Sequence, residues 1–98
     1  MPKVEFTWDE PEYNREYFED CRSGEYKTGQ YRVTAYLIPH KHPKYVSYLC
    51  EVTCWSQSDN THLSTSVYVD RKDEQAAMAA ATHLGERLLA AIEPFRVG

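Results

Sequence analysis

The sequence lacks most of the features that mark a secreted or membrane protein. Its three cysteines are too few, and odd in number, for a disulfide framework, which is typical of proteins from a reducing compartment. No apolar run approaches the ~20 residues that span a bilayer, and the first ten residues lack the apolar segment of a signal peptide. We therefore expect a cytoplasmic protein without membrane contact.

Catalytic signatures are also missing. The sequence contains no Gly-x-Ser-x-Gly elbow and no phosphate-binding glycine loop. Spacing alone leaves open a nucleophilic pair of Cys54 with His62 or His83, but buried cysteines are usually inert. We predict no catalytic residue, no cofactor and no enzymatic activity, and an uncharacterised enzyme is the third-ranked alternative.

Cysteine and histidine do not occur in a pattern that predicts a metal site. Cys50 and Cys54 are four residues apart on a predicted strand, which separates them by roughly 13 Å. Two thiolates on one zinc ion lie about 4 Å apart, because each Zn–S bond is ~2.3 Å. We therefore interpret both cysteines as small buried side chains and predict no metal.

Positive charge is scarce, and the excess of acids lies at one end of the chain. The 98 residues are 42% hydrophobic and 27% charged, which fits one globular domain over residues 1–98. The net charge is −4, and residues 1–25 carry eight acidic but only three basic side chains. This distribution disfavours non-specific nucleic-acid binding, which depends on neutralising phosphates.

The segment DEPEYNREYFED (residues 9–20) is the most acidic part of the chain and is predicted to be a helix. Tyr13, Tyr17 and Cys21 recur at helical spacing and would form its apolar stripe. Four carboxylates would form a second stripe: Glu12, Glu16, Glu19 and Asp20. Residues 23–29, with a glycine near each end, are predicted to be the following turn.

Three strands and a long helix are predicted for the rest of the chain. Residues 31–39, 45–55 and 62–70 alternate apolar and polar side chains with a period of two, as strands with one buried face do. Residues 70–95 carry apolar side chains at helical spacing, and Asp70 or Asp73 can cap this helix. The predicted fold is α+β: a helix, a three-stranded antiparallel meander and a C-terminal helix (αβββα).

This order of elements resembles the double-stranded RNA-binding domain. The resemblance covers about Glu12 to Ile92 and implies a long last helix packed over a three-stranded sheet. It also implies RNA contacts from the loop between the first two strands and from the start of the last helix. The matching residues are Lys41, His42, Lys44, Arg71 and Lys72, although Asp73 and Glu74 follow the last two.

A looser similarity is to small, acidic, tyrosine-rich phage proteins of the anti-CRISPR and anti-defence type. Proteins of that kind generally cover a nucleic-acid-binding surface on a larger complex or hold its subunits apart. The similarity rests on size and composition, and no motif defines the group. It implies an inhibitor that binds a basic protein surface.

Two surfaces are candidate binding sites. The first is the acidic stripe defined above, which would steer a positively charged partner. The second is the sheet face opposite the core, where aromatic side chains would anchor a partner or be covered by the chain itself. Its candidate residues are Tyr36, Tyr45, Trp55 and Tyr68.

The leading hypothesis is a non-catalytic binding protein that presents these two surfaces to a basic protein surface. RNA binding ranks second, because acids on the first helix would repel phosphates. A homodimer is compatible with either hypothesis.

Overall fold

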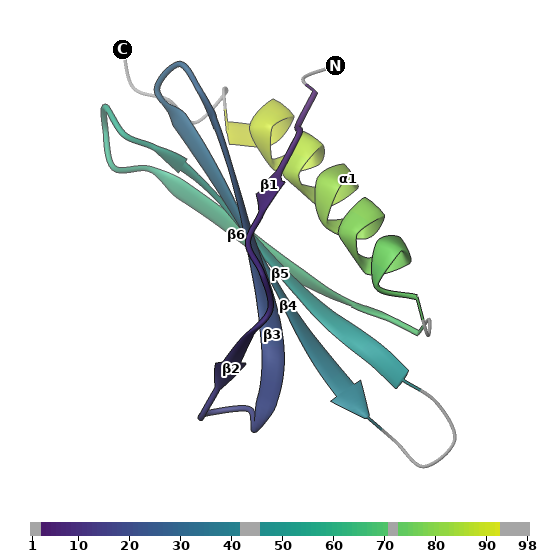
Figure 1. Cartoon of the computed structure of the whole chain (residues 1–98). Coiled ribbons are helices and arrows are strands. Elements are labelled where there is room, and N and C mark those ends of the chain that lie inside the picture. The colour runs from purple at the N-terminus through teal and green to yellow at the C-terminus, as the bar shows by residue number, and fades with distance from the viewer. Residues whose placement is uncertain (1–2, 42–45, 71–72, 93–98) are drawn as a thin grey trace.

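The computed structural model describes residues 3–41, 46–70 and 73–92. One twisted antiparallel sheet carries a single long helix on one face (Figure 1). The strands are β1 (Thr7–Trp8), β2 (Glu12–Asn14), β3 (Glu19–Thr28), β4 (Tyr31–Lys41), β5 (Val46–Ser56) and β6 (His62–Val69), and the helix is α1 (Glu74–Ile92). β1 and β2 both pair with β3, and β3 to β6 follow one another in chain order. The predicted α+β class is confirmed.

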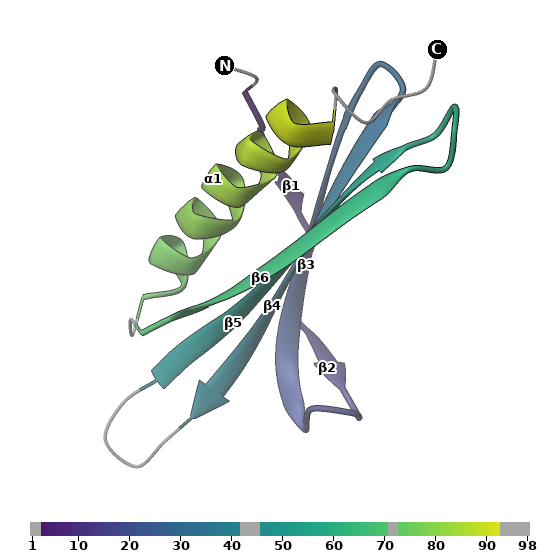
Figure 2. The same ribbon diagram turned by 180° about the vertical axis from the view of Figure 1, so that it is seen from behind.

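The three predicted strands and the long helix form where the sequence predicts them, as β4, β5, β6 and α1. α1 lies along one face of the sheet (Figure 2). The side chains that it covers come from alternate positions of β4 and β5. The buried ones are Val33, Ala35 and Leu37 on β4 and Cys50, Val52 and Cys54 on β5. The helix contributes Ala77, Ala81, Leu89 and Ile92 to the same core. Its small alanines let the helix backbone approach the sheet closely.

The predicted first helix is wrong. Residues 12–14 and 19–28 are strands, and residues 15–18 are the turn between them. Helical spacing in this segment was misleading because both faces of β3 carry polar side chains, so that no period of two is visible. Pairing of residues 12–14 with residues 19–21, and of residues 22–28 with β4, satisfies these backbone groups better than an isolated helix could.

Asn14 builds the turn that replaces the helix. Its side-chain oxygen accepts a hydrogen bond from the Glu16 N–H (2.8 Å), and its carbonyl accepts one from the Phe18 N–H (2.9 Å). Asparagine favours such turns because its side chain mimics a backbone carbonyl. Phe18 closes the turn with a φ of 56°, which is unusual for a residue with a side chain.

The predicted turn at residues 23–29 is also corrected, because most of it is strand. The β3–β4 connection is only Gly29–Gln30, and Gly29 has a φ of 57°. Gly24 instead lies within β3, where the Trp8 ring packs directly against it. A glycine in a strand often marks such a close approach.

The N-terminal segment is tied to both the sheet and the helix. Val4 is buried, and its N–H donates to Glu86 Oε2 of α1 at 3.0 Å. Arg22 donates to the Asp9 carbonyl (2.8 Å) and to Glu74 Oε1 at the start of α1 (2.9 Å). The Arg22 guanidinium therefore connects β3, on which it lies, with the segment that follows β1 and with the start of α1.

Asp73 caps α1, because its side-chain oxygen accepts a hydrogen bond from the Gln75 N–H at 2.9 Å. Of the two cap candidates, this selects Asp73. α1 does not combine the length and the apolar character that crossing a membrane requires, and it is the one helix in the described ranges.

Candidate functional site

The face of the sheet opposite α1, here called the open face, is not covered by a helix in the described part of the chain. Paired residues of neighbouring strands share a face, so the register fixes its members. From β3 to β6 they are Ser23, Glu25, Lys27, Arg32, Thr34, Tyr36, Ile38, His40, Ser47, Leu49, Glu51, Thr53, Trp55, His62, Ser64, Ser66 and Tyr68. The register thus brings the predicted Tyr36, Trp55 and Tyr68 onto one face, and Tyr45 lies outside the described residues.

The β2–β3 turn covers one end of the open face. The Tyr17 ring lies 6.5 Å from the Tyr36 ring, and Asn14 Nδ2 donates to the Tyr36 hydroxyl at 2.6 Å. Cys21 and Ile38 are almost fully buried there, although they point away from α1. A small second apolar cluster therefore lies under the turn, so the chain itself covers part of the predicted aromatic surface.

The aromatic rings beyond this cluster are exposed. Tyr68 retains 65% of its accessible surface and Trp55 retains 39%. Each has a histidine beside it: the Trp55 and His62 rings are 4.8 Å apart, and the Tyr68 and His40 rings are 5.7 Å apart. These ring contacts restrict the two side chains but leave much of their surface exposed.

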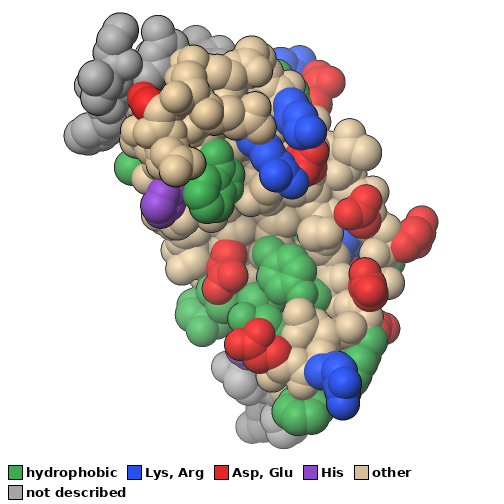
Figure 3. All heavy atoms as spheres, turned by 90° about the vertical axis from the view of Figure 1, so that its left-hand side faces the viewer, with side chains coloured by type: hydrophobic (Ala, Val, Ile, Leu, Met, Phe, Trp, Pro, Cys, Tyr) green, Lys and Arg blue, Asp and Glu red, His purple; other side chains and the backbone are tan. Residues whose placement is uncertain are grey.

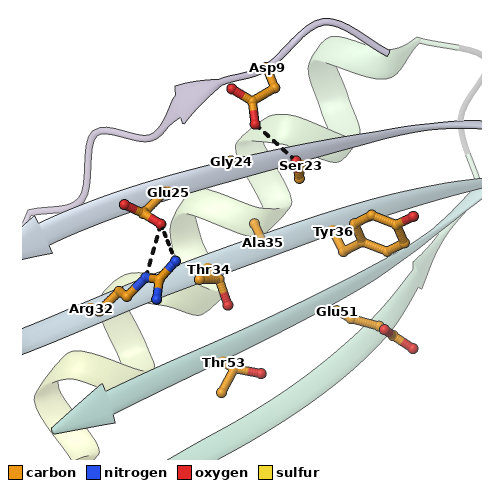
Figure 4. A pocket seen from close by; sticks show the side chains of 10 residues that line it. All are labelled: Asp9, Ser23, Gly24, Glu25, Arg32, Thr34, Ala35, Tyr36, Glu51 and Thr53. Atoms are coloured by element: carbon orange, nitrogen blue, oxygen red, sulfur yellow. Dashed lines mark hydrogen bonds and ion pairs between the residues drawn. The ribbon is translucent and has the colours of Figure 1, made fainter. Parts of the chain in front are cut away.

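A hollow of about 430 Å³ lies between the N-terminal strand and the centre of the open face (Figure 4). Arg32 Nε and Nη2 both donate to Glu25 Oε2, at 2.9 and 2.5 Å, and this hydrogen bonding lowers the pKa of Glu25. Asp9 accepts a hydrogen bond from the Ser23 hydroxyl at 3.2 Å, whereas Glu51 has no ion-pair partner among the described residues. The hollow is therefore acidic: three carboxylates face one guanidinium.

The four acids of the predicted stripe do not share one face, which corrects that prediction. In the β2–β3 hairpin Glu12 pairs with Cys21 and Tyr13 pairs with Asp20. Glu12 and Glu19 therefore point to the side of the open face, Asp20 points to the opposite side with Tyr13, and Glu16 lies in the turn. A strand period of two, not the helical period, decides this arrangement.

Carboxylates nevertheless surround the apolar part of the open face. Figure 3 views the molecule from the left-hand side of Figure 1 and shows acidic side chains among the hydrophobic ones in its lower half. Glu19 forms an ion pair with Lys41 at 3.3 Å. Glu12, Glu16 and Glu51 form no ion pair with any basic side chain in the described part of the chain.

Of the five residues that the RNA-binding resemblance implicates, one can be placed. Lys41 is exposed at the end of β4, and its ammonium group already contacts Glu19. His42, Lys44, Arg71 and Lys72 lie outside the described residues. The first helix of the predicted αβββα order is replaced by the β2–β3 hairpin.

Cys50 and Cys54 both point toward α1 and are buried in the core. Burial raises the pKa of each thiol to about 11, so both are protonated at neutral pH. Cys50 Sγ also lies 3.5 Å from the Ala77 carbonyl. Within residues 3–41, 46–70 and 73–92, no three His, Cys, Asp or Glu side chains are grouped as metal ligands would be.

Several residues of the site were not anticipated from the sequence. Asp9 and Ser23 reach the hollow because β1 pairs with β3, and Asn14 reaches Tyr36 because the chain turns back at residues 15–18. Pro11 and Asn14 were the signals in the sequence, since both favour turns over helix interiors.

Comparisons with protein-family models, with curated proteins and with solved structures found no match to this chain.

Proposed function

We propose that this protein is a non-catalytic binding module whose open face docks on a basic surface of another protein. The observation that supports it is the combination of exposed aromatic rings on the open face with carboxylates on or beside it that form no ion pair among the described residues. Aromatic residues supply much of the energy at protein interfaces, and unpaired charges steer the partner. An inhibitor of the anti-defence type is the narrower form of the proposal, and it rests on size and composition.

Three aromatic side chains are suited to anchor the partner. Trp55 and Tyr68 project from the sheet, and Phe18 projects from the hairpin turn with 76% of its surface exposed. Phe18 also has a left-handed backbone conformation, which costs about 1–2 kcal/mol for a residue with a Cβ. The exposed Phe18 ring gains little packing within the chain to offset this cost. A contact between this ring and a partner would offset it.

The unpaired acids account for the expected charge of the partner. Glu12, Glu16 and Glu51 present negative charge on or beside the open face, and the hollow around Asp9 adds more. A basic surface would neutralise these charges, whereas a nucleic acid would be repelled by them. The association rate should therefore decrease as salt is added, because exposed charges are screened over about 10 Å at 0.1 M.

A matched pair of charge reversals tests the proposal. Glu12→Lys and Asp20→Lys change the net charge equally in one hairpin, but they lie on opposite sides of it. Both positions are exposed, so each variant should keep its fold. We expect affinity capture followed by mass spectrometry to recover a partner with the wild type and with Asp20→Lys, and much less of it with Glu12→Lys.

Kinetic measurements on the captured partner separate steering from anchoring. Glu12→Lys should lower the association rate mainly at low salt, whereas Tyr68→Ala and Trp55→Ala should raise the dissociation rate at every salt concentration. Phe18→Gly should weaken binding while leaving the fold as stable or more stable, because glycine tolerates a positive φ. Equal binding by the wild type, Glu12→Lys and Tyr68→Ala would refute the proposed surface.

The same capture experiment, repeated with nuclease, tests the second-ranked function. Recovery that nuclease abolishes, together with tight duplex binding at physiological salt, would favour RNA over a protein partner.

A further inference from the structure

β6 is an unprotected edge of the sheet. It pairs with β5 on one side, and no strand in the described ranges pairs with its outer side. Over eight residues, His62–Val69, it contains no Asp, Glu, Lys, Arg or Pro. Natural proteins usually protect an exposed edge of this length with charges, prolines or bulges, because its free N–H and C=O groups can pair with another strand.

The opposite edge of the sheet carries such protection. It is formed by β1 and β2, which are only two and three residues long. Asp9, Glu10 and Pro11 separate them, so this edge has two charges and a residue without an N–H. The contrast between the two edges indicates that β6 is left open for pairing.

We propose that β6 pairs antiparallel with β6 of a second copy of this chain, forming a continuous sheet across a two-fold axis. The net charge of −4 and the acidic open face make most other approaches of two copies repulsive. β6 contains no Asp, Glu, Lys or Arg, so two copies can meet there without carboxylates or basic side chains of like charge in contact. This proposal does not depend on the proposed function, and pairing along the edge of β6 leaves the centre of the open face uncovered in both copies.

The side chains of β6 select the register of this pair. A two-fold axis perpendicular to the sheet keeps both helices on one side, so residues facing α1 must oppose residues that face α1. Pairing centred on Thr65 places Leu63 opposite Val67 of the second copy, and His62 opposite Tyr68 of the second copy. Val67 (39% exposed) and Tyr68 (65% exposed) are the exposed large apolar side chains of β6. Both gain an opposing side chain in this register.

The strand edge alone is a small interface. Stable complexes bury about 1,200–2,000 Å² in total, and eight residues of one strand supply less. We therefore expect a reversible dimer that forms as the concentration rises.

Cross-linking through engineered cysteines tests the register. In the proposed pair the two copies of Thr65 face each other, with Cα atoms about 4.5–5.5 Å apart, which a disulfide can bridge. The two copies of Ser66 would be about 8 Å apart, which is too far. We expect a covalent dimer from Thr65→Cys under mild oxidation and little from Ser66→Cys. The three native cysteines are buried and should not compete.

A pair of charge variants tests the interface without any cross-link. Ser64 of one copy opposes Ser66 of the other, and both serines are exposed. The double variant Ser64→Lys with Ser66→Lys places like charges opposite each other twice, so its dimer dissociation constant should rise at least tenfold. The double variant Ser64→Glu with Ser66→Lys places unlike charges there and should keep the dimer.

Sedimentation equilibrium, without any partner protein, measures the dimer dissociation constant of the purified wild type and of the two double variants. Concentration-dependent dimerisation of the wild type and of the Glu/Lys variant, but not of the Lys/Lys variant, would support the proposal. A wild type that stays monomeric from micromolar to millimolar concentration would overturn it. A dimer that the Lys/Lys variant retains, or equal cross-linking at positions 65 and 66, would overturn it as well.

Discussion

A methyl group added at Gly24 is expected to destabilise this protein through a single contact. An ideal Cβ at Gly24 would lie 2.7 Å from Cε3 of Trp8 and 3.0 Å from both Cδ2 and Cζ3. Non-bonded carbon atoms prefer about 3.5–4.0 Å, so the indole ring must move by roughly 1 Å. The ring is held by its neighbours, because Trp8 pairs with Gly24 through the backbone and its ring packs 5.1 Å from the Phe6 ring.

The expected size of the effect follows from two opposing terms. Overpacking of this kind costs about 1–3 kcal/mol. Replacing a glycine inside a strand recovers about 0.5–1 kcal/mol, because the unfolded chain loses conformational freedom. The Gly24→Ala variant should therefore lose up to about 2.5 kcal/mol of unfolding free energy. In a domain of this size, each kcal/mol lowers the melting temperature by about 4–8 °C.

A double-mutant cycle in urea tests whether Trp8 is the cause. Trp8→Val removes all three ring atoms, so in that background Gly24→Ala should be neutral or stabilising. Gly29→Ala is the control, because Gly29 has open space around it and a φ of 57°. Gly29→Ala should lower the unfolding free energy by the same amount whether position 8 is Trp or Val. If Gly24→Ala costs the same in both backgrounds, the packing of Trp8 on β3 is not as described.

Three further predictions concern the buried polar and thiol groups. His40 Nε2 is buried without a hydrogen-bond partner among the described atoms, so His40→Leu should leave the urea midpoint unchanged or raise it, and a clear decrease would contradict this. Because the pKa of Cys50 and Cys54 rises from 9.0 to about 11 on folding, the native state holds these protons more tightly. The unfolding free energy should therefore decrease between about pH 9 and 11, and a Cys50→Ala, Cys54→Ala variant should show a smaller decrease. Finally, mass spectrometry should find both thiols unmodified by iodoacetamide at neutral pH until urea unfolds the protein; rapid labelling of the native state would show that they are accessible.

The sequence was sufficient to predict the elements that have one buried and one exposed face. β4, β5 and β6 each place apolar residues at every second position because α1 covers one side of them. α1 itself was evident from helical spacing and from Asp73, whose side chain caps it. In these segments the local pattern and the tertiary environment agree, which is why periodicity identifies them.

Residues 9–28 were predicted wrongly because their pattern reflects other constraints. Tyr13, Tyr17 and Cys21 have helical spacing, but each is placed by a different contact. Tyr13 is exposed beside Asp20, Tyr17 folds over Tyr36, and Cys21 lies buried under the turn. These three contacts do not follow a helical period. They arise because β3 pairs with β2 and with β4.

The candidate site divides in the same way. Periodicity alone placed Tyr36, Trp55 and Tyr68 on one face, and composition alone showed an excess of acids near the N-terminus. Neither periodicity nor composition could show that Asp9 and Glu51 line one hollow. The two residues are 42 positions apart in the sequence and come together only across β3 and β4.

The sequence by itself determined which faces of β4, β5, β6 and α1 are apolar, because burial on one side imposes a repeat that is visible residue by residue. Only the tertiary structure decided that residues 12–28 form a hairpin and that the open face is acidic at its centre. Strand pairing satisfies backbone hydrogen bonds between segments that are distant in the sequence, and side chains that are polar on both faces leave no repeat to reveal it.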